Sequence, residues 1–235
     1  KLYDPENSTI GNWSSELNSN YSDGTSSFTG VNPANGVVIY YNIGKEDNGK
    51  KVSIKIFDQN NKLVRELTSD PDNSFISYNG GPSTEPLLSN KIGINRFVWD
   101  TRHTSLKGVP YAYIEGSFRG HKSIPGKYKL ILKVGENSYT SEFEILKNPN
   151  FSVSDNDYLD LEKYASHMES NFNEMASYIN NNKKLIDKLS VLLEELDENS
   201  EVKKNGKKLL ELMDNWDKKM MQRMSKAYDD VENFP

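Results

Sequence analysis

The stretch VSIKIFDQNNKLVREL, residues 52–67, decides the fold class of the first part of the chain. Apolar and polar side chains alternate over residues 52–57, which is the period of a half-buried strand. Residues 58–61 are Asp, Gln, Asn and Asn, a cluster typical of a turn. Residues 62–67 then return as a second strand, so the stretch predicts a β-hairpin.

Four further segments carry strand signals. They are short apolar or alternating runs bounded by turn residues: 37–43, 95–100, 128–134 and 139–145. A long loop rich in Pro, Gly, Asn and Ser, residues 68–92, separates the hairpin from the later strands. Several short strands with turns between them are typical of an all-β sandwich. We therefore expect an antiparallel β-sandwich, immunoglobulin-like or fibronectin-like, over residues 36–150.

Near residue 150 the apolar period changes to that of helices. Ser154, with Asp157 three residues later, resembles a helix N-terminus of the capping-box kind. An apolar stripe follows at four- and three-residue spacing: Leu161, Ala165, Met168, Phe172, Met175 and Ile179. Asn180–Asn182 interrupts it, and two later stripes follow: Leu185, Leu189, Leu192, Leu196, then Leu209, Met213, Trp216, Met220, Met224, Ala227. We expect a helical domain over residues 151–235, as an antiparallel helical hairpin or a three-helix bundle, and an α+β chain overall.

Composition excludes several classes of protein. The 235 residues carry a net charge of -5, which does not fit a nucleic-acid binder with a basic footprint. The absence of Cys excludes disulfides and thiol catalysis, and no apolar run of 18 residues is present to cross a membrane. Residues 1–35, rich in Ser, Asn, Gly and Asp without a sustained period, are expected to be a linker or an N-terminal arm. The two ends lead us to expect a fragment of a longer polypeptide.

No catalytic, cofactor or metal site is predicted. The three histidines, His103, His121 and His167, have no ligand partner at helical spacing, although His103 and His121 could still meet in space. Paired carboxylates lie in predicted helix first turns or on polar helix faces. The methionines lie mostly on the helical stripes, where they either pack in a core or form an adaptable binding surface. We expect a non-catalytic chain without cofactors.

Two features of the predicted sandwich stand out. Trp99, Asp100 and Arg102 form a short string in which the Trp is expected to be buried while the Asp and Arg close the following turn. The loop 104–125 concentrates aromatic side chains beside an arginine, as contact surfaces do: Tyr111, Tyr113, Phe118 and Arg119. Packing of this loop onto its own sandwich is the alternative interpretation.

Several strings resemble one known family over roughly residues 28–235. They are the runs 31–41, 52–67 and 93–102, Pro125-Gly126-Lys127-Tyr128, and the exit 143–149. The chain resembles the region downstream of the β-propeller in bacterial sortilin-type, BNR-repeat proteins, which are often labelled glycosyl hydrolases. Its sandwich part is similar to the immunoglobulin-like module of flagellar hook-capping proteins. The resemblance marks Gly126 and Tyr128 as structural residues.

The resemblance implies a function and a location. It implies a binding or scaffolding module of a larger protein in the cell envelope or secreted, from a Bacteroidota-like proteome. The implied partners are a β-propeller in the same polypeptide and another envelope protein. The alternative is an accessory domain of a glycan-active, sialidase-like enzyme whose catalytic propeller is absent from this chain.

Overall fold

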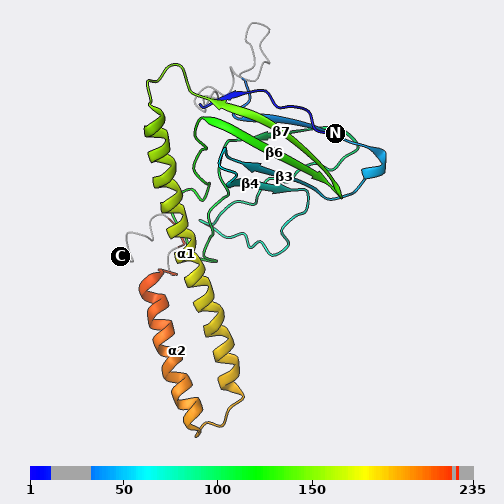
Figure 1. Cartoon of the computed structure of the whole chain (residues 1–235). Coiled ribbons are helices and arrows are strands. Elements are labelled where there is room, and N and C mark those ends of the chain that lie inside the picture. Colours follow the sequence, from blue (N-terminus) through cyan, green and yellow to red (C-terminus); the bar gives the residue numbers. More distant parts are fainter. Residues whose placement is uncertain (12–32, 224–225, 228–235) are drawn as a thin grey trace. The chain divides into compact units, whose positions relative to one another are not determined.

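The computed structural model describes residues 1–11, 33–223 and 226–227 (Figure 1). The chain divides into two compact units. Unit 1 comprises residues 1–73, 85–104 and 120–166, and unit 2 comprises residues 74–84, 105–119 and 167–235. Unit 1 contains both sheets, and unit 2 contains most of the helical residues, so the fold class is α+β.

Unit 1 contains a five-stranded sheet and a two-stranded sheet (Figure 1). The larger sheet has the order β1 (Ser8–Thr9), β7 (Asn137–Leu146), β6 (Gly126–Val134), β3 (Val52–Phe57), β4 (Leu63–Thr68). The smaller sheet pairs β2 (Val37–Ile43) antiparallel with β5 (Gly93–Trp99). A short 3-10 helix, η2 (Lys45–Asp47), follows β2. Every predicted strand segment is therefore found in the sheets.

The large sheet is mixed, and this corrects the expectation of a purely antiparallel one. β1 runs parallel to β7, with Ser8 opposite Ile145, while the remaining pairs of this sheet are antiparallel. β1 lies in the stretch 1–35 that was expected to be a linker or an N-terminal arm, and Ser8 and Thr9 of this stretch join the sheet. A two-residue strand of Ser and Thr has no apolar period by which it could be recognised. Residues 12–32 of the expected arm lie outside the described residues.

One hydrophobic core receives side chains from both sheets. Alternate residues of β2, β3 and β6 are buried in it: Val37, Ile39, Tyr41, Ile43, Val52, Ile54, Ile56, Tyr128, Leu130, Leu132 and Val134. A β-bulge between Ile56 and Phe57 changes the register of the predicted hairpin. As a result Val64 and Arg65 are both buried, whereas Leu63 is exposed.

Helix α1 (Asp155–Glu194) is one continuous helix of 40 residues. It begins as predicted, because Ser154 Oγ accepts from the Asp157 amide and the Asp157 carboxylate accepts from the Ser154 amide. The expected break at Asn180–Asn182 is wrong. The Asn180 and Asn182 side chains donate to the carbonyls of Gly108 and Met213 instead of bonding their own backbone, so the helix continues through them.

Helix α2 (Glu201–Met220) contacts the C-terminal half of α1, where Gly206 lies against Leu193 and Asn182 donates to the Met213 carbonyl. The buried apolar residues of α1 are Ala176, Ile179, Ile186 and Leu193. Met175, Leu185 and Leu192, which the apolar stripe predicts to be buried, are exposed instead. At these three positions, the buried side chain of α1 therefore belongs to the residue that follows the predicted one. The apolar side chains of α1 occupy a face wider than one stripe. The rest of unit 2 covers only one edge of this face.

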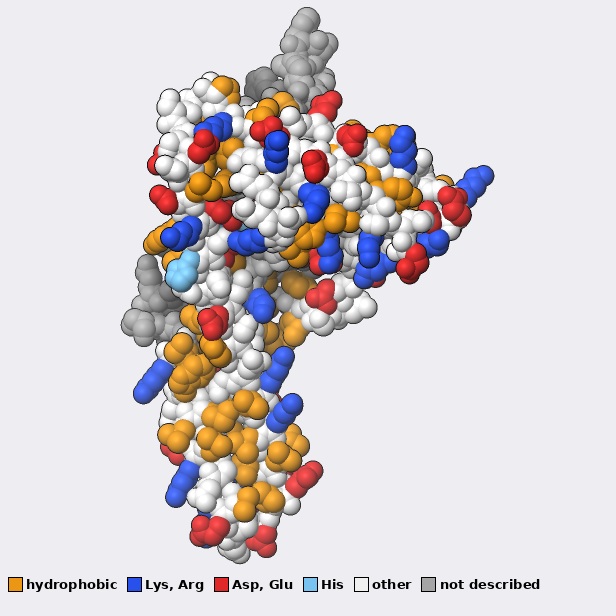
Figure 2. Space-filling view, in the orientation of Figure 1, with side chains coloured by type: hydrophobic (Ala, Val, Ile, Leu, Met, Phe, Trp, Pro, Cys, Tyr) orange, Lys and Arg blue, Asp and Glu red, His pale blue; other side chains and the backbone are white. Residues whose placement is uncertain are grey.

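The segment 105–119 also packs on α1 within unit 2. Val109 and Ala112 form a small core with Ala176 and Ile179. The remaining apolar side chains gather on the surface of the helix pair, as Figure 2 shows. Over the described residues, neither helix has an apolar stretch sufficient to span a lipid bilayer.

Candidate functional site

The turn that ends β5 is built by the predicted structural string. Trp99 is 1% exposed, and its Nε1 donates to the carbonyl of Arg102 at 2.9 Å. The Asp100 carboxylate accepts from the Arg102 amide at 3.2 Å, which closes an Asx turn. Thr101 between them has φ of 61°, in the left-handed region that β-branched residues rarely adopt. The string therefore reverses the chain sharply and positions the residue after it, His103.

The reversed chain pairs with a distant segment of unit 1. Arg102 and Lys122 form an antiparallel bridge, and the His103 amide donates to the His121 carbonyl at 2.9 Å. Residues 103 and 121 are therefore opposite one another in this short ladder, where Cβ atoms lie about 4.5–5.5 Å apart. The Arg102 Nη1 also donates to the Gly120 carbonyl at 2.8 Å. Backbone pairing thus explains why the two histidines meet.

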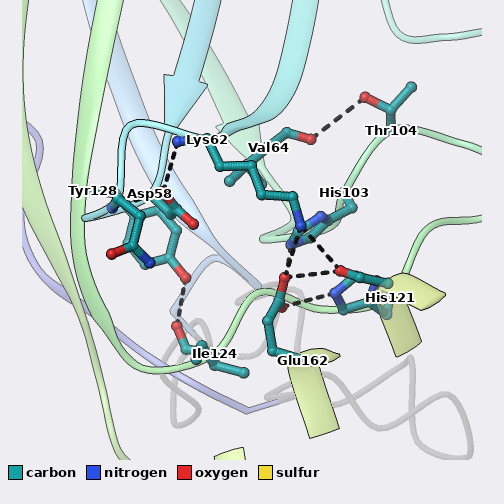
Figure 3. Close-up of polar contacts among 11 residues, drawn as sticks. Asp58, Lys62, Val64, His103, Thr104, His121, Ile124, Tyr128 and Glu162 are labelled. Carbon is teal, nitrogen blue, oxygen red and sulfur yellow. Dashed lines mark hydrogen bonds and ion pairs between the residues drawn. The ribbon is translucent and has the colours of Figure 1, made fainter. Parts of the chain in front are cut away.

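The two imidazoles stack and face one carboxylate, as Figure 3 shows. Their ring centroids lie 3.9 Å apart, with 26° between the planes. Glu162, in the second turn of α1, places its Oε2 atom 2.8 Å from Nε2 of His121 and 3.6 Å from Nε2 of His103. The side chains of His103, His121 and Glu162 are only 11%, 14% and 21% exposed. We call these three residues the histidine–glutamate cluster.

The second oxygen of Glu162 has partners of its own. Its Oε1 accepts from Ser166 Oγ at 3.1 Å and lies 3.7 Å from Lys62 Nζ. Lys62 in turn donates to Ser166 Oγ at 3.2 Å. The carboxylate is therefore held from one side, and its other oxygen is turned toward the two imidazoles (Figure 3).

The pKa of Glu162 reflects opposing effects. Burial raises it, but the hydrogen bond from His121 lowers it, as do the charges of the imidazoles in their protonated form and the bond from Ser166. The net effect lowers the pKa of Glu162 to about 2. The carboxylate is ionised at neutral pH and can only accept, so His121 Nε2 is the donor of the 2.8 Å bond.

A small pocket of about 50 Å³ opens beside the cluster. Residues of the hairpin, of the turn before β6 and of α1 line it, among them Asp58, Val64, His103, Tyr128 and Glu162. This volume is enough for an ion with its water but too small for a drug-sized organic ligand, which needs about 300 Å³ or more.

Gly126 and Tyr128 lie in β6 beside this pocket. Gly126 has φ of 152°, and a Cβ there would meet nothing closer than 3.8 Å, so the backbone conformation rather than space favours glycine. Tyr128 is buried, packs on Trp99 and Phe143, and donates to the Ile124 carbonyl at 2.7 Å. Burial raises the pKa of Tyr128.

The expected contact residues of the 104–125 loop do not form one exposed surface. Tyr111 is exposed and Arg119 is exposed, whereas Tyr113 is half-buried and its hydroxyl donates to Glu115. Phe118 is buried, and this corrects its assignment to a contact surface. Its ring packs edge-on against Phe172 of α1, with centroids 6.0 Å apart, because α1 offers an apolar face to this segment.

The structure thus brings together residues that sequence reasoning treated separately. It joins His103 to His121, a meeting that the sequence left open, and adds Glu162 and Lys62, which no motif indicated. In comparisons with known proteins, no family model, curated protein or solved structure matches this chain. The resemblance to sortilin-type, BNR-repeat proteins therefore stays a prediction.

Proposed function

We propose that this chain is a non-catalytic binding or scaffolding module that makes protein–protein contacts through an apolar face of its helices. Ten large apolar side chains of unit 2, each 38–67% exposed, carry this proposal: Met168, Met175, Tyr178, Leu185 and Leu192 in α1, and Val202, Leu209, Leu212, Trp216 and Met220 in α2. We call these ten residues the helix-pair face. Their separations of three, four and seven residues keep each set on one side of its helix.

Helix α2 gives the clearest support. Its buried residues are both charged: Lys203 donates to the Leu196 carbonyl, and Asp217 pairs with Arg223. Five of its large apolar side chains are instead exposed on the helix-pair face, while Leu210 and Met213 are partly buried. A helix that is amphipathic but leaves its apolar stripe uncovered is typical of a surface that docks another helix.

The size of the helix-pair face suits a stable interface. Ten side chains that are about half exposed present on the order of 800 Å², if each has roughly 150–200 Å² in all. A standard protein–protein interface buries about 800 Å² on each partner. The face is therefore large enough to bind one partner helix along its length.

Charge at the edge of this face is of mixed sign. Lys188 follows Leu185 by three residues and Lys219 follows Trp216 by three, whereas Glu174 precedes Tyr178 by four, and all three charged side chains are exposed. Another helix that carries both acidic and basic side chains beside its apolar stripe would pair with them. We therefore propose an amphipathic helix of another protein as the occupant.

The broader context belongs to the same proposal. We propose that unit 1 is an immunoglobulin-like or fibronectin-like sandwich and that α1 and α2 form a helical hairpin. The parent is proposed to be a larger cell-envelope or secreted protein that also contains a β-propeller. The alternation of buried residues in β2, β3 and β6 supports the sandwich, and the strings quoted above support the parent protein.

The experiment compares face variants in affinity purification of the full-length protein from its native cells. Leu212→Asp and Trp216→Asp place a charge on the helix-pair face. Lys204→Asp, at another exposed position of α2, is the matched control. Circular dichroism of the purified chains first shows that all variants keep their helices.

We expect one identified protein to co-purify with the wild type and with Lys204→Asp but not with the face variants. Its binding segment, made as a peptide, should then bind the purified chain with the same dependence on the variants. If all variants retain the same co-purifying proteins, the proposal is wrong. It is also wrong if sedimentation shows that the wild type covers this face by forming a dimer.

A further inference from the structure

We propose that the histidine–glutamate cluster of unit 1 binds a divalent transition-metal ion, with Zn²⁺ as the best match. The proposed ligand atoms are Nε2 of His103, Nε2 of His121 and Oε2 of Glu162. This site is separate from the helix-pair face and does not depend on the proposed function.

The donor set has the chemistry that zinc prefers. Imidazole nitrogens and a carboxylate oxygen bind Zn²⁺ at about 2.0–2.2 Å, commonly with two histidines and one glutamate as the protein ligands. Hard cations such as Mg²⁺ and Ca²⁺ prefer oxygen-only sites, so two imidazoles disfavour them. The three residues come from three separate segments of the chain.

The two distances from Glu162 suit ligands around one ion. Two ligands of a tetrahedral ion with bonds of about 2.0–2.1 Å lie about 3.4 Å apart. Glu162 Oε2 lies 2.8 Å from one imidazole Nε2 and 3.6 Å from the other, which brackets this value. A ring nitrogen of His103 also lies within 4.8 Å of one of His121. An ion would take the place of the hydrogen between His121 and Glu162. The two rings would also have to turn apart, because imidazoles bound to one tetrahedral ion have centroids about 5 Å apart instead of the 3.9 Å of the stacked pair.

The surroundings hold the proposed ligands in place. The backbone ladder fixes His103 opposite His121, and the Arg65 guanidinium donates to the His103 carbonyl. The second oxygen of Glu162 is bound by Ser166 and lies near Lys62, so Oε2 stays turned toward the imidazoles. Partners of this kind orient metal ligands and raise affinity. The small pocket beside His103 and Glu162 has room for a water molecule in the fourth position.

The consequence would be a metal cross-link within unit 1. The ion would tie the turn after β5 and the segment before β6 to the second turn of α1. Because the unfolded chain does not hold these three residues together, zinc would bind the folded state and raise its melting temperature.

The test is zinc titration of the full chain after dialysis against a chelator. Isothermal titration calorimetry with ZnCl₂ should show one ion bound per chain, and Co²⁺ should give the visible absorption of a tetrahedral nitrogen–oxygen site. The melting temperature of the wild type should rise with zinc. His103→Ala, His121→Ala and Glu162→Gln should each weaken binding by at least about 100-fold. The matched control is His167→Ala, which removes the third histidine, exposed on α1, and should bind as the wild type does.

Folding of the variants is checked without metal. Glu162→Gln keeps the size of the side chain and one accepting oxygen, so it should melt cooperatively even if a histidine variant does not. The proposal is overturned if the wild type binds no zinc below about 100 μM. It is equally overturned if Glu162→Gln, folded by circular dichroism, binds zinc as tightly as the wild type. Neither result bears on partner binding by the helix-pair face.

Discussion

Leu193 of α1 lies so close to Gly206 of α2 that a Cβ at position 206 would be 2.4 Å from the Leu193 Cδ2 atom. Leu193 is buried in this contact, so its methyl groups have little freedom to move aside. A glycine inside α2 looks unfavourable from the sequence, since it costs about 1 kcal/mol relative to Ala. The contact shows why a residue without a side chain fits at this position.

This contact predicts that the effect of Gly206→Ala on the free energy of unfolding changes sign when Leu193 is truncated. Gly206→Ala in the wild type should lower the free energy of unfolding by about 1 kcal/mol, because overpacking outweighs the gain in helix propensity. In a Leu193→Ala background the space is free, so the same substitution should raise it by up to about 1 kcal/mol. Urea denaturation of the four proteins measures both effects. Equal effects in the two backgrounds would contradict the contact.

Trp99 should be among the most costly core residues to truncate. Trp99→Ala removes a buried ring that contacts Tyr128 and Phe143, and should lower the free energy of unfolding by about 3–5 kcal/mol. Trp99→Phe keeps a ring but removes the bond to the Arg102 carbonyl, and should cost about 1–3 kcal/mol. Ile94→Ala, at an exposed position of the same strand, should stay within about 0.5 kcal/mol. A loss below about 1 kcal/mol for Trp99→Ala in chemical denaturation would refute this.

The Asp217–Arg223 pair predicts a pH dependence of stability. Nε and Nη2 of Arg223 donate to the two oxygens of Asp217 at 2.6 and 2.8 Å. This hydrogen bonding lowers the pKa of Asp217 below 3.8, although burial opposes the shift. A carboxylate with a depressed folded-state pKa adds stability that is present above the unfolded pKa, near 3.8, and is lost as pH falls toward the folded pKa.

Asp217→Asn should therefore cost roughly 2 kcal/mol at pH 7. The difference from the wild type should shrink as pH falls below about 3.8, which denaturation series between pH 7 and pH 2 measure. The control is Asp214→Asn, whose exposed pair with Lys218 should contribute less than about 0.5 kcal/mol at any pH. A difference for Asp217→Asn that stays constant down to pH 2 would exclude the pair as its source.

Arg65 links the hairpin to the histidine–glutamate cluster. Its buried guanidinium donates to the His103 carbonyl and pairs with Glu85. Arg65→Met should lower the free energy of unfolding by about 2 kcal/mol and weaken zinc binding about tenfold, because His103 loses a group that positions it. The comparison is Lys55→Met, which breaks the exposed pair with Glu66 in the same hairpin and should change neither quantity measurably. Unchanged zinc affinity in Arg65→Met would show that His103 is positioned without it.

The strands and the start of α1 were predictable because local pattern determines them. The alternation in residues 52–57 and 128–134 reappears as buried and exposed faces of β3 and β6, and Ser154 begins α1. The bulge at Ile56 was not predictable from the period of two, since it depends on how one strand meets its neighbour. The continuity of α1 through Asn180–Asn182 depends on carbonyls elsewhere in unit 2.

The candidate site was predictable only in part. The turn at Trp99–Arg102 is a local motif, and its structural role follows from the string itself. The meeting of His103 with His121 depends on the register of a ladder whose two sides are 18 residues apart, with no strand pattern on either side. Glu162 reaches the imidazoles only because of where α1 begins relative to that ladder. Tertiary placement of this kind leaves no periodic signal in the sequence.

The parallel pairing of β1 with β7 also has a consequence for folding during synthesis. Ser8 and Ile145 are 137 residues apart, as are Asn7 and the Glu144 amide that it binds. A ribosome that adds about 5–20 residues per second needs roughly 7–27 s to cover that distance. Throughout that time β1 has no strand to pair with. Once β7 has been made, the outer edge of β7 stays unpaired until β1 binds to it. We therefore expect this edge to close late during synthesis and, until it closes, to be open to pairing with another chain.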